Sequence, residues 1–171
     1  MSEKTWYDLS DIADLVPKRM IKETNYFNGN FSECNRFNIP GLFYGAMTDT
    51  CLTGPQEAPF NVMVDDVGQE FIFRQPTDLF ELDCILQAAN FDPFEGYGAD
   101  GDVHWTLRLI REWWESCDDL LDEVESLRQH NENVKEWKQY LLGPAIEYLR
   151  QYAFFVEEGK RPLAFDVLPI L

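Results

Sequence analysis

The sequence predicts one α+β domain spanning residues 1–171, in which a small antiparallel meander is packed by flanking helices. Two observations lead to this prediction. From residue 41 the sequence has the character of strands, with a two-residue alternation at residues 60–64 and 70–74, whereas apolar residues recur every three or four positions on either side of this region. Hydrophobic residues make up 45% of the chain and aromatic residues 15%, which suffices for a core, and no repeat, low-complexity segment or clear linker divides it.

The first forty residues are expected to hold one short helix and then an irregular connection. Apolar residues at positions 9, 12, 13 and 16, with acids between them, predict an amphipathic helix. Pro17 either bounds this helix or lies within a kink. The segment 25–40 is rich in asparagine and glycine, which is typical of an irregular segment.

Three strands are expected in the middle of the chain. The segment 41–47 is the first candidate, and residues 60–64 and 70–74 alternate between apolar and polar side chains. The turn sequence from Asp65 to Gly68 lies between the last two, so these are predicted to form an antiparallel hairpin. Together the three segments predict a three-stranded meander over about residues 41–74.

Helices are expected over most of the remaining chain. Thr77 is predicted to cap the first of them, because a hydroxyl can accept from a free helical N–H. A long amphipathic helix is predicted over about residues 103–128, with its apolar stripe and its acidic residues on opposite sides. A C-terminal helix is predicted over about residues 133–158, and Gly143–Pro144 is expected to kink or divide it.

The charge of the chain limits the partners that it can bind. Asp and Glu number 31 against 14 Lys and Arg, for a formal net charge of −17. Six of the carboxylates fall within residues 115–125, a stretch that contains no cation. Such a surface repels nucleic-acid phosphate and anionic membrane, and it attracts basic proteins and cations.

The acidic stretch has two interpretations. It is either a solvated helix face that keeps the protein soluble, or a surface that steers a basic partner toward it. We favour the second, because the run lacks compensating lysines. The leading hypothesis is therefore a non-enzymatic protein that binds, and inhibits or neutralises, a basic toxin, nuclease or nucleic-acid-binding protein. The predicted contact residues are Glu112, Glu115, Asp118, Asp119, Asp122, Glu123 and Glu125.

Several patterns indicate a soluble cytoplasmic protein without a cofactor. No apolar run approaches the ~18 residues of a spanning helix, and the N-terminus lacks the pattern of a secretory signal. The four cysteines are widely spaced, which predicts free thiols in a reducing compartment. No cysteine has the local sequence of a catalytic nucleophile, so no catalytic residue is assigned.

The loop before the long helix supports an alternative function. Residues 96–101 read G-x-G-x-x-G, but no buried strand precedes them, so dinucleotide binding is not expected. The loop also holds a group of oxygen ligands and one histidine that would suit calcium or magnesium in a small metal-dependent hydrolase or a ligand-binding domain. A simpler interpretation is that Asp102 caps the helix that begins near Val103. The candidate ligands are Asp92, Glu95, Asp100, Asp102 and His104.

Overall fold

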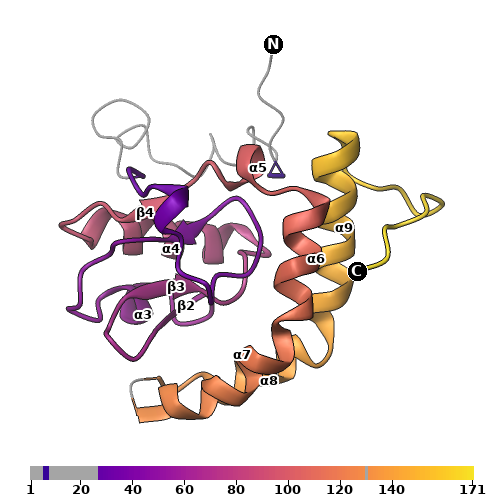
Figure 1. Cartoon of the computed structure of the whole chain (residues 1–171). Coiled ribbons are helices and arrows are strands. Elements are labelled where there is room, and N and C mark those ends of the chain that lie inside the picture. The colour runs from indigo at the N-terminus through magenta and orange to yellow at the C-terminus, as the bar shows by residue number, and fades with distance from the viewer. Residues whose placement is uncertain (1–5, 8–26, 130) are drawn as a thin grey trace.

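The computed structural model describes residues 6–7, 27–129 and 131–171, and it shows a mixed helix and strand architecture (Figure 1). The short helix predicted over residues 9–16 lies outside the described residues. In chain order the elements are η1 (Phe31–Glu33), β1 (Tyr44–Gly45), α3 (Gly54–Glu57), β2 (Val62–Val64), β3 (Glu70–Ile72), α4 (Leu79–Phe91), β4 (Tyr97–Gly98), α5 (Gly101–His104), α6 (Leu107–Glu115), α7 (Cys117–Val124), η2 (Glu125–Gln129), α8 (Val134–Leu141) and α9 (Pro144–Glu158).

The strands form two small antiparallel sheets rather than the predicted three-stranded meander. The hairpin is as predicted: β2 pairs with β3, with Val62 opposite Ile72 and Val64 opposite Glu70. The predicted pairing of the first strand is wrong, because β1 pairs with β4 and not with the hairpin. Tyr44 lies opposite Gly98, so segments more than fifty residues apart in the sequence form this second sheet.

A buried side chain explains why β1 and β3 do not form a continuous sheet. The Oδ1 atom of Asn38 accepts from the amides of Gly45 and Ile72, at 2.8 Å each. Its Nδ2 atom donates to the carbonyl of Gly45 at 2.7 Å and to that of Asn35 at 2.7 Å. The amide of Asn38 thus satisfies backbone groups that a direct strand pair would use, and it joins β1 to β3 through a side chain.

Two further side-chain amides extend the short strands in the same way. Asn131 accepts from Val64 N at 2.9 Å and donates to Val64 O at 2.8 Å, which attaches the segment before α8 to the edge of β2. Gln75 accepts from Phe43 N at 3.2 Å and donates to Phe43 O at 2.7 Å. Each amide supplies one donor and one acceptor, as a neighbouring strand would.

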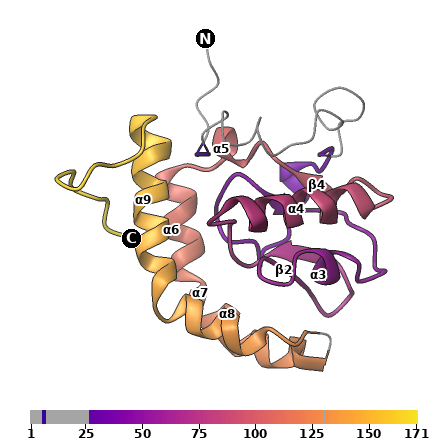
Figure 2. The same ribbon diagram turned by 180° about the vertical axis from the view of Figure 1, so that it is seen from behind.

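Helix α4 covers one side of the two sheets and comes to the front in Figure 2. Its buried side chains Leu82, Ile85 and Leu86 pack with Phe43, Val62, Ile72 and Tyr97 in one apolar cluster. The predicted cap at Thr77 is wrong by one residue, because the Asp78 carboxylate accepts from Glu81 N at 2.9 Å. Glu81 in turn accepts from Thr77 N at 2.9 Å, so two backbone N–H groups at the helix start are satisfied by side-chain carboxylates.

The prediction of one continuous helix over residues 103–128 is wrong, since the structure divides this segment into α5, α6, α7 and η2. Trp105 is extended and ends α5, and Thr106 caps α6 through Oγ1, which accepts from Leu109 N at 3.3 Å. Ser116 separates α6 from α7, and its hydroxyl donates to Trp113 O at 2.7 Å. A local bond of this kind competes with the regular helix pattern and favours a bend.

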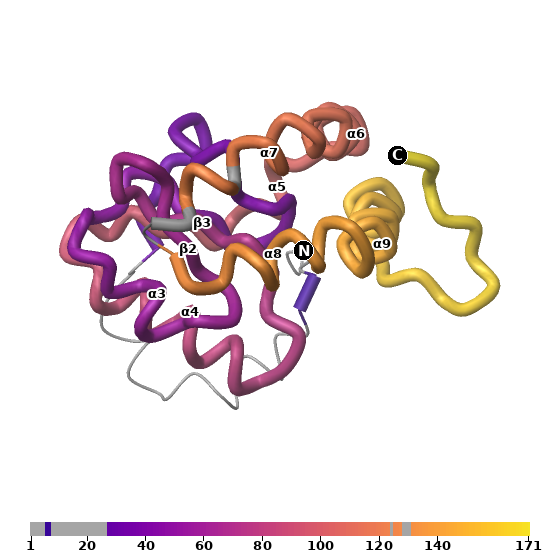
Figure 3. Tube along the Cα trace, turned by 90° about the horizontal axis from the view of Figure 1, so that it is seen from below, coloured from indigo at the N-terminus to yellow at the C-terminus, as the bar shows by residue number. Residues whose placement is uncertain are grey.

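The C-terminal helix is divided at Gly143 into α8 and α9, as the Gly143–Pro144 pair predicts. Figure 3 shows α6 and α9 nearly end-on, while α7 and α8 run across the view toward β2 and β3. These four helices form a bent helical arm beside the sheets and α4. A second apolar cluster joins the arm to the rest of the protein, and it includes Phe37, Phe71 and Trp137. No helix in the described part of the chain is both long and apolar enough to cross a membrane.

Candidate functional site

The seven predicted contact residues lie on α6, α7 and the start of η2, and not on one straight face. Glu112 and Glu115 belong to α6, and Glu125 begins η2. The bend at Ser116 turns α7 away from the axis of α6, so that α7, which bears four of the seven residues, runs toward the β2–β3 hairpin (Figure 3). These four residues are Asp118, Asp119, Asp122 and Glu123.

Three of the seven carboxylates form ion pairs within the chain. Glu112 pairs with Arg108, Glu123 with Arg36 and Glu125 with Lys138. The other four are exposed, and they have no ion pair or side-chain hydrogen bond with the residues that the structure describes. We call these four the free carboxylates: Glu115, Asp118, Asp119 and Asp122.

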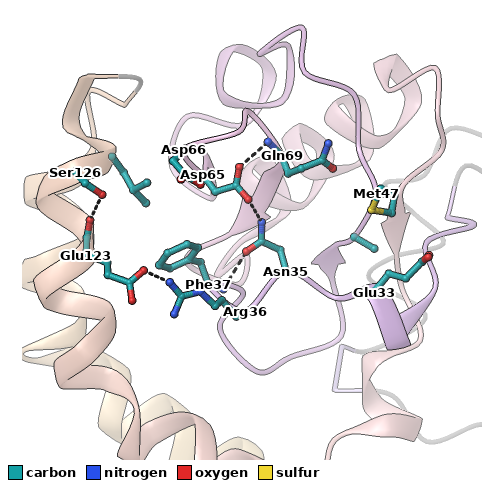
Figure 4. A pocket seen from close by; sticks show the side chains of 12 residues that line it. Glu33, Asn35, Arg36, Phe37, Met47, Asp65, Asp66, Gln69, Glu123 and Ser126 are labelled. Atoms are coloured by element: carbon teal, nitrogen blue, oxygen red, sulfur yellow. Dashed lines mark hydrogen bonds and ion pairs between the residues drawn. The ribbon is translucent and has the colours of Figure 1, made fainter.

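An acidic cleft opens between the end of α7 and the β2–β3 hairpin (Figure 4). Its volume is about 370 Å³. The hairpin turn, the segment around η1 and the end of β1 form one side, and the end of α7 with the start of η2 forms the other. The lining residues are Glu33, Asn35, Arg36, Phe37, Ala46, Met47, Asp65, Asp66, Gln69, Glu123, Ser126 and Leu127.

The cleft is negatively charged. Among its described lining residues, four carboxylates face one guanidinium, that of Arg36, which gives a net charge of −3. Glu33 and Asp66 are exposed, and their carboxylates have no partner among the described residues. Glu123 belongs both to the cleft and to the predicted contact residues, so the two acidic regions are continuous.

The hairpin turn fixes the position of Asp65. Asp65 Oδ1 accepts from Gln69 N at 2.8 Å and from Val67 N at 3.1 Å, and Asp65 Oδ2 accepts from Asn35 Nδ2 at 2.9 Å. Gly68 completes the turn with a φ of 86°, which glycine adopts without strain. The turn therefore holds Asp65 inward, and its neighbour Asp66 is left exposed at the mouth of the cleft.

The bottom of the cleft is apolar. Phe37 and Leu127 are buried, and the Phe37 ring packs on Phe71 and Trp137. The Arg36 guanidinium lies over the Phe37 ring at 4.6 Å from its centre. An aromatic face below and carboxylates around the rim are the surroundings that stabilise an organic cation.

Sequence reasoning found only one of the acids that line the cleft. From the sequence, Asp65 and Asp66 are expected only to form a turn, and Glu33 lies in a segment that is expected to be irregular. Long-range packing brings these segments to α7, and no spacing rule along the chain reveals it. The signal that was present is the placement of two adjacent acids at the tip of a predicted hairpin.

The five ligands of the alternative site do not gather around one point: Asp100 and His104 are in contact with each other, and the other three have partners elsewhere in the protein. Asp92 is buried and accepts from the amides of Asp49, Phe94 and Gly96 at 2.8–3.1 Å. Glu95 accepts from Asn28 Nδ2. Within the part of the chain that the structure describes, no group of three or more His, Cys, Asp or Glu side chains is placed to hold a metal ion.

The helix-cap interpretation of Asp102 is wrong, because its carboxylate bonds to distant segments. Oδ2 accepts from Trp6 N and Oδ1 from the Tyr152 hydroxyl, each at 2.7 Å. Burial raises the pKa of Asp102 above its ordinary value, although both hydrogen bonds oppose this. Asp100 instead accepts from the Tyr44 hydroxyl at 2.7 Å and lies 3.0 Å from His104 Nε2. His104 stacks on Phe31 with ring centres 4.6 Å apart.

Three of the four free cysteines, Cys34, Cys84 and Cys117, have thiols whose pKa is raised by burial. Burial raises the pKa of Cys34 to about 12 and that of Cys117 to about 11, so both thiols are protonated at neutral pH. Cys51 is exposed and Cys84 is partly buried.

A second hollow lies between α8 and the residues next to β2 and β3. It has a volume of about 780 Å³ and is lined mainly by Phe60, Phe73, Tyr140 and two prolines. Arg74 in this hollow pairs with Glu81, and only Glu132 and Glu136 add negative charge to its described lining. It is therefore less acidic than the cleft.

Comparison of the chain with protein-family models, curated proteins and solved structures finds no match.

Proposed function

We propose that this protein binds a basic protein and thereby inhibits or neutralises it. The observation that carries the proposal is the continuity of the acidic cleft with the free carboxylates of α6 and α7, through Glu123. Unpaired carboxylates on one side of a protein attract a basic surface over several ångströms and speed its approach. The partly apolar cleft then supplies contact area that a solvated charge run lacks.

Charge reversal on α6 and α7 tests the proposal. In the triple variant Glu115→Lys, Asp119→Lys and Asp122→Lys, we expect association with the partner to slow by on the order of tenfold or more at low ionic strength, because its basic surface is then repelled. All three residues are exposed, so the fold is expected to persist. The partner is first captured from the native host lysate, and its association rate is then measured with the parent and the variant.

A matched control separates local charge from total charge. Glu132, Glu157 and Glu158 are exposed residues outside the cleft and outside α6 and α7, and their replacement by lysine makes the same change in net charge. We expect this control to retain most of the association rate, and the parent to lose its partner between about 0.05 M and 0.5 M salt. Equal rates for the parent and the first variant would disprove the proposal.

A second candidate function is ligand binding beside His104. Two observations favour it: Asp100 and Phe31 orient the His104 ring, and the neighbouring Trp105 has a buried Nε1 without a hydrogen-bond partner. If a divalent ion or a metabolite binds there, it raises the melting temperature through linkage, and His104→Ala abolishes the rise. Thermal unfolding across a panel of Ca²⁺, Mg²⁺, Mn²⁺, Zn²⁺ and common metabolites measures this. An unchanged melting temperature throughout the panel would count against this function.

A further inference from the structure

The acidic cleft already holds one guanidinium, which comes from the chain itself. Arg36 lies over the face of Phe37 and pairs with Glu123 across the cleft (Figure 4). The two charged side chains remain 58% and 43% exposed. Exposed ion pairs contribute little to stability, so another cation can replace Arg36 at low cost.

The remainder of the cleft has carboxylates without cations. Glu33 and Asp66 have no partner among the described residues, and Asp65 is held at the bottom of the turn by Asn35 and backbone amides. The volume of about 370 Å³ lies at the low end of the ~300–1,000 Å³ range of ligand sites, which suits a single side chain better than a folded element. Size and charge both match one long basic side chain.

We propose that the cleft binds one arginine side chain of the basic partner, and that Arg36 competes with this arginine for Phe37 and Glu123. The proposal rests on the proposed function and specifies its chemistry. Arginine is favoured over lysine because a planar guanidinium stacks on an aromatic ring and bonds a carboxylate through two parallel N–H groups. Lysine presents a compact, strongly hydrated charge that gains less from the ring.

A peptide titration of the ¹⁵N-labelled full chain tests this assignment. The probe is a capped pentapeptide in which two arginines alternate with three glycines, and the comparison peptide carries lysines in their place. We expect the largest amide shifts at Asn35, Phe37, Asp66, Gln69 and Ser126, which line the cleft. The arginine peptide is expected to bind at least about threefold more tightly than the lysine peptide, because only arginine stacks well on Phe37.

Two variants with matched charge test the competition by Arg36. Arg36→Gln frees Glu123 and the Phe37 face, and we expect it to strengthen binding of the arginine peptide by about threefold or more. Arg108→Gln also removes one cation and frees one glutamate, Glu112, but outside the cleft. It is expected to change the affinity by less than about 1.5-fold, since only general charge is altered. An otherwise unchanged amide spectrum verifies the fold of each variant.

The outcomes separate this assignment from the proposed function. Equal affinities for the two peptides, equal effects of the two variants, or shifts confined to α7 outside the cleft would each overturn the arginine site and leave the proposed function standing. Loss of the natural partner from the triple α6–α7 variant, together with an intact arginine site, would support both. If neither peptide shifts any amide and that variant keeps its partner, both proposals are wrong.

Discussion

Replacing Asn38 with alanine is expected to lower the free energy of unfolding by about 3–5 kcal/mol, because each buried backbone group left without a partner costs about 1–3 kcal/mol. Asn38 is 1% exposed, and its side-chain amide forms hydrogen bonds with the N–H and C=O of Gly45 and with the N–H of Ile72. Alanine removes all of these bonds at a position that is closed to bulk solvent. The losses are not additive, so the estimate lies below the sum of the separate penalties.

Urea unfolding of the parent and Asn38→Ala measures this difference. Asn90→Ala is the control, because Asn90 is exposed near the end of α4. We expect this control to stay within about 0.5 kcal/mol of the parent, as is usual for surface substitutions. A loss of under about 1 kcal/mol in Asn38→Ala would show that β1 and β3 are held together in some other way.

Asn38 also illustrates why the sheet topology was only partly predictable. The hairpin of β2 and β3 was visible in the alternating residues on either side of the Asp65–Gly68 turn, because its pairing is local. The strands β1 and β4 are two residues long, so neither shows a period, and α3, the hairpin and α4 separate them in the sequence. Asn38 lies in a segment of turn-forming residues, where an asparagine does not distinguish a buried bridge from a surface loop.

The helical arm shows a different limit of sequence patterns. The apolar spacing from Ile110 to Leu127 continues through Ser116, because the side chains on both sides of the bend pack on the same core. The apolar spacing shows which side of each helix is buried, but it does not show whether the helix axis changes direction. Gly143–Pro144 was recognisable because proline restricts the backbone itself.

The pattern of charges predicted part of the candidate site for a related reason. The free carboxylates are neighbours in the sequence, so their density is visible without a fold. The cleft joins acids from η1, the hairpin turn and α7, and it exists only after the arm packs beside the hairpin. Arg36 and Phe37, adjacent residues with no motif around them, acquire their roles from the same packing.

A second large effect is expected from Glu70, whose carboxyl group is fully buried on β3. Burial, together with the nearby carboxylates of Asp49 and Asp92, raises its pKa from an ordinary 4.5 to about 7. Hydrogen bonds from the Tyr97 hydroxyl and from Gly54 N, at 2.5 and 2.7 Å, oppose this shift. The folded protein therefore binds a proton at Glu70 more readily than the unfolded chain does.

The sign of the pH dependence follows from this difference. Well below pH 4.5 Glu70 is protonated in both states and carries no penalty. As the pH rises toward 7, the unfolded chain releases the proton first, so stability falls by an amount that reaches about 3 kcal/mol once the pH exceeds the folded pKa. The stability contributed by the protonated group is thus present in acid and lost near neutrality.

Glu70→Gln is expected to remove this part of the pH dependence. A glutamine keeps one acceptor for Gly54 N, and its NH₂ group can donate to the Tyr97 oxygen, so it resembles the protonated acid without ever ionising. At pH 8 the variant should be more stable than the parent by up to about 3 kcal/mol, and near pH 4.5 the two should agree. Urea unfolding at half-unit steps between pH 4.5 and 8.5 gives the difference at each pH.

Tyr97→Phe provides the opposing test at the same place. It removes the hydroxyl that favours the ionised carboxylate and keeps the buried ring, so the pKa of Glu70 rises further. The loss of stability is then expected to continue to higher pH than in the parent, whereas Glu70→Gln flattens it. Parallel stability curves for the parent and Glu70→Gln between pH 4.5 and 8.5 would mean that Glu70 titrates alike in the folded and unfolded states, contrary to its burial beside Asp49 and Asp92.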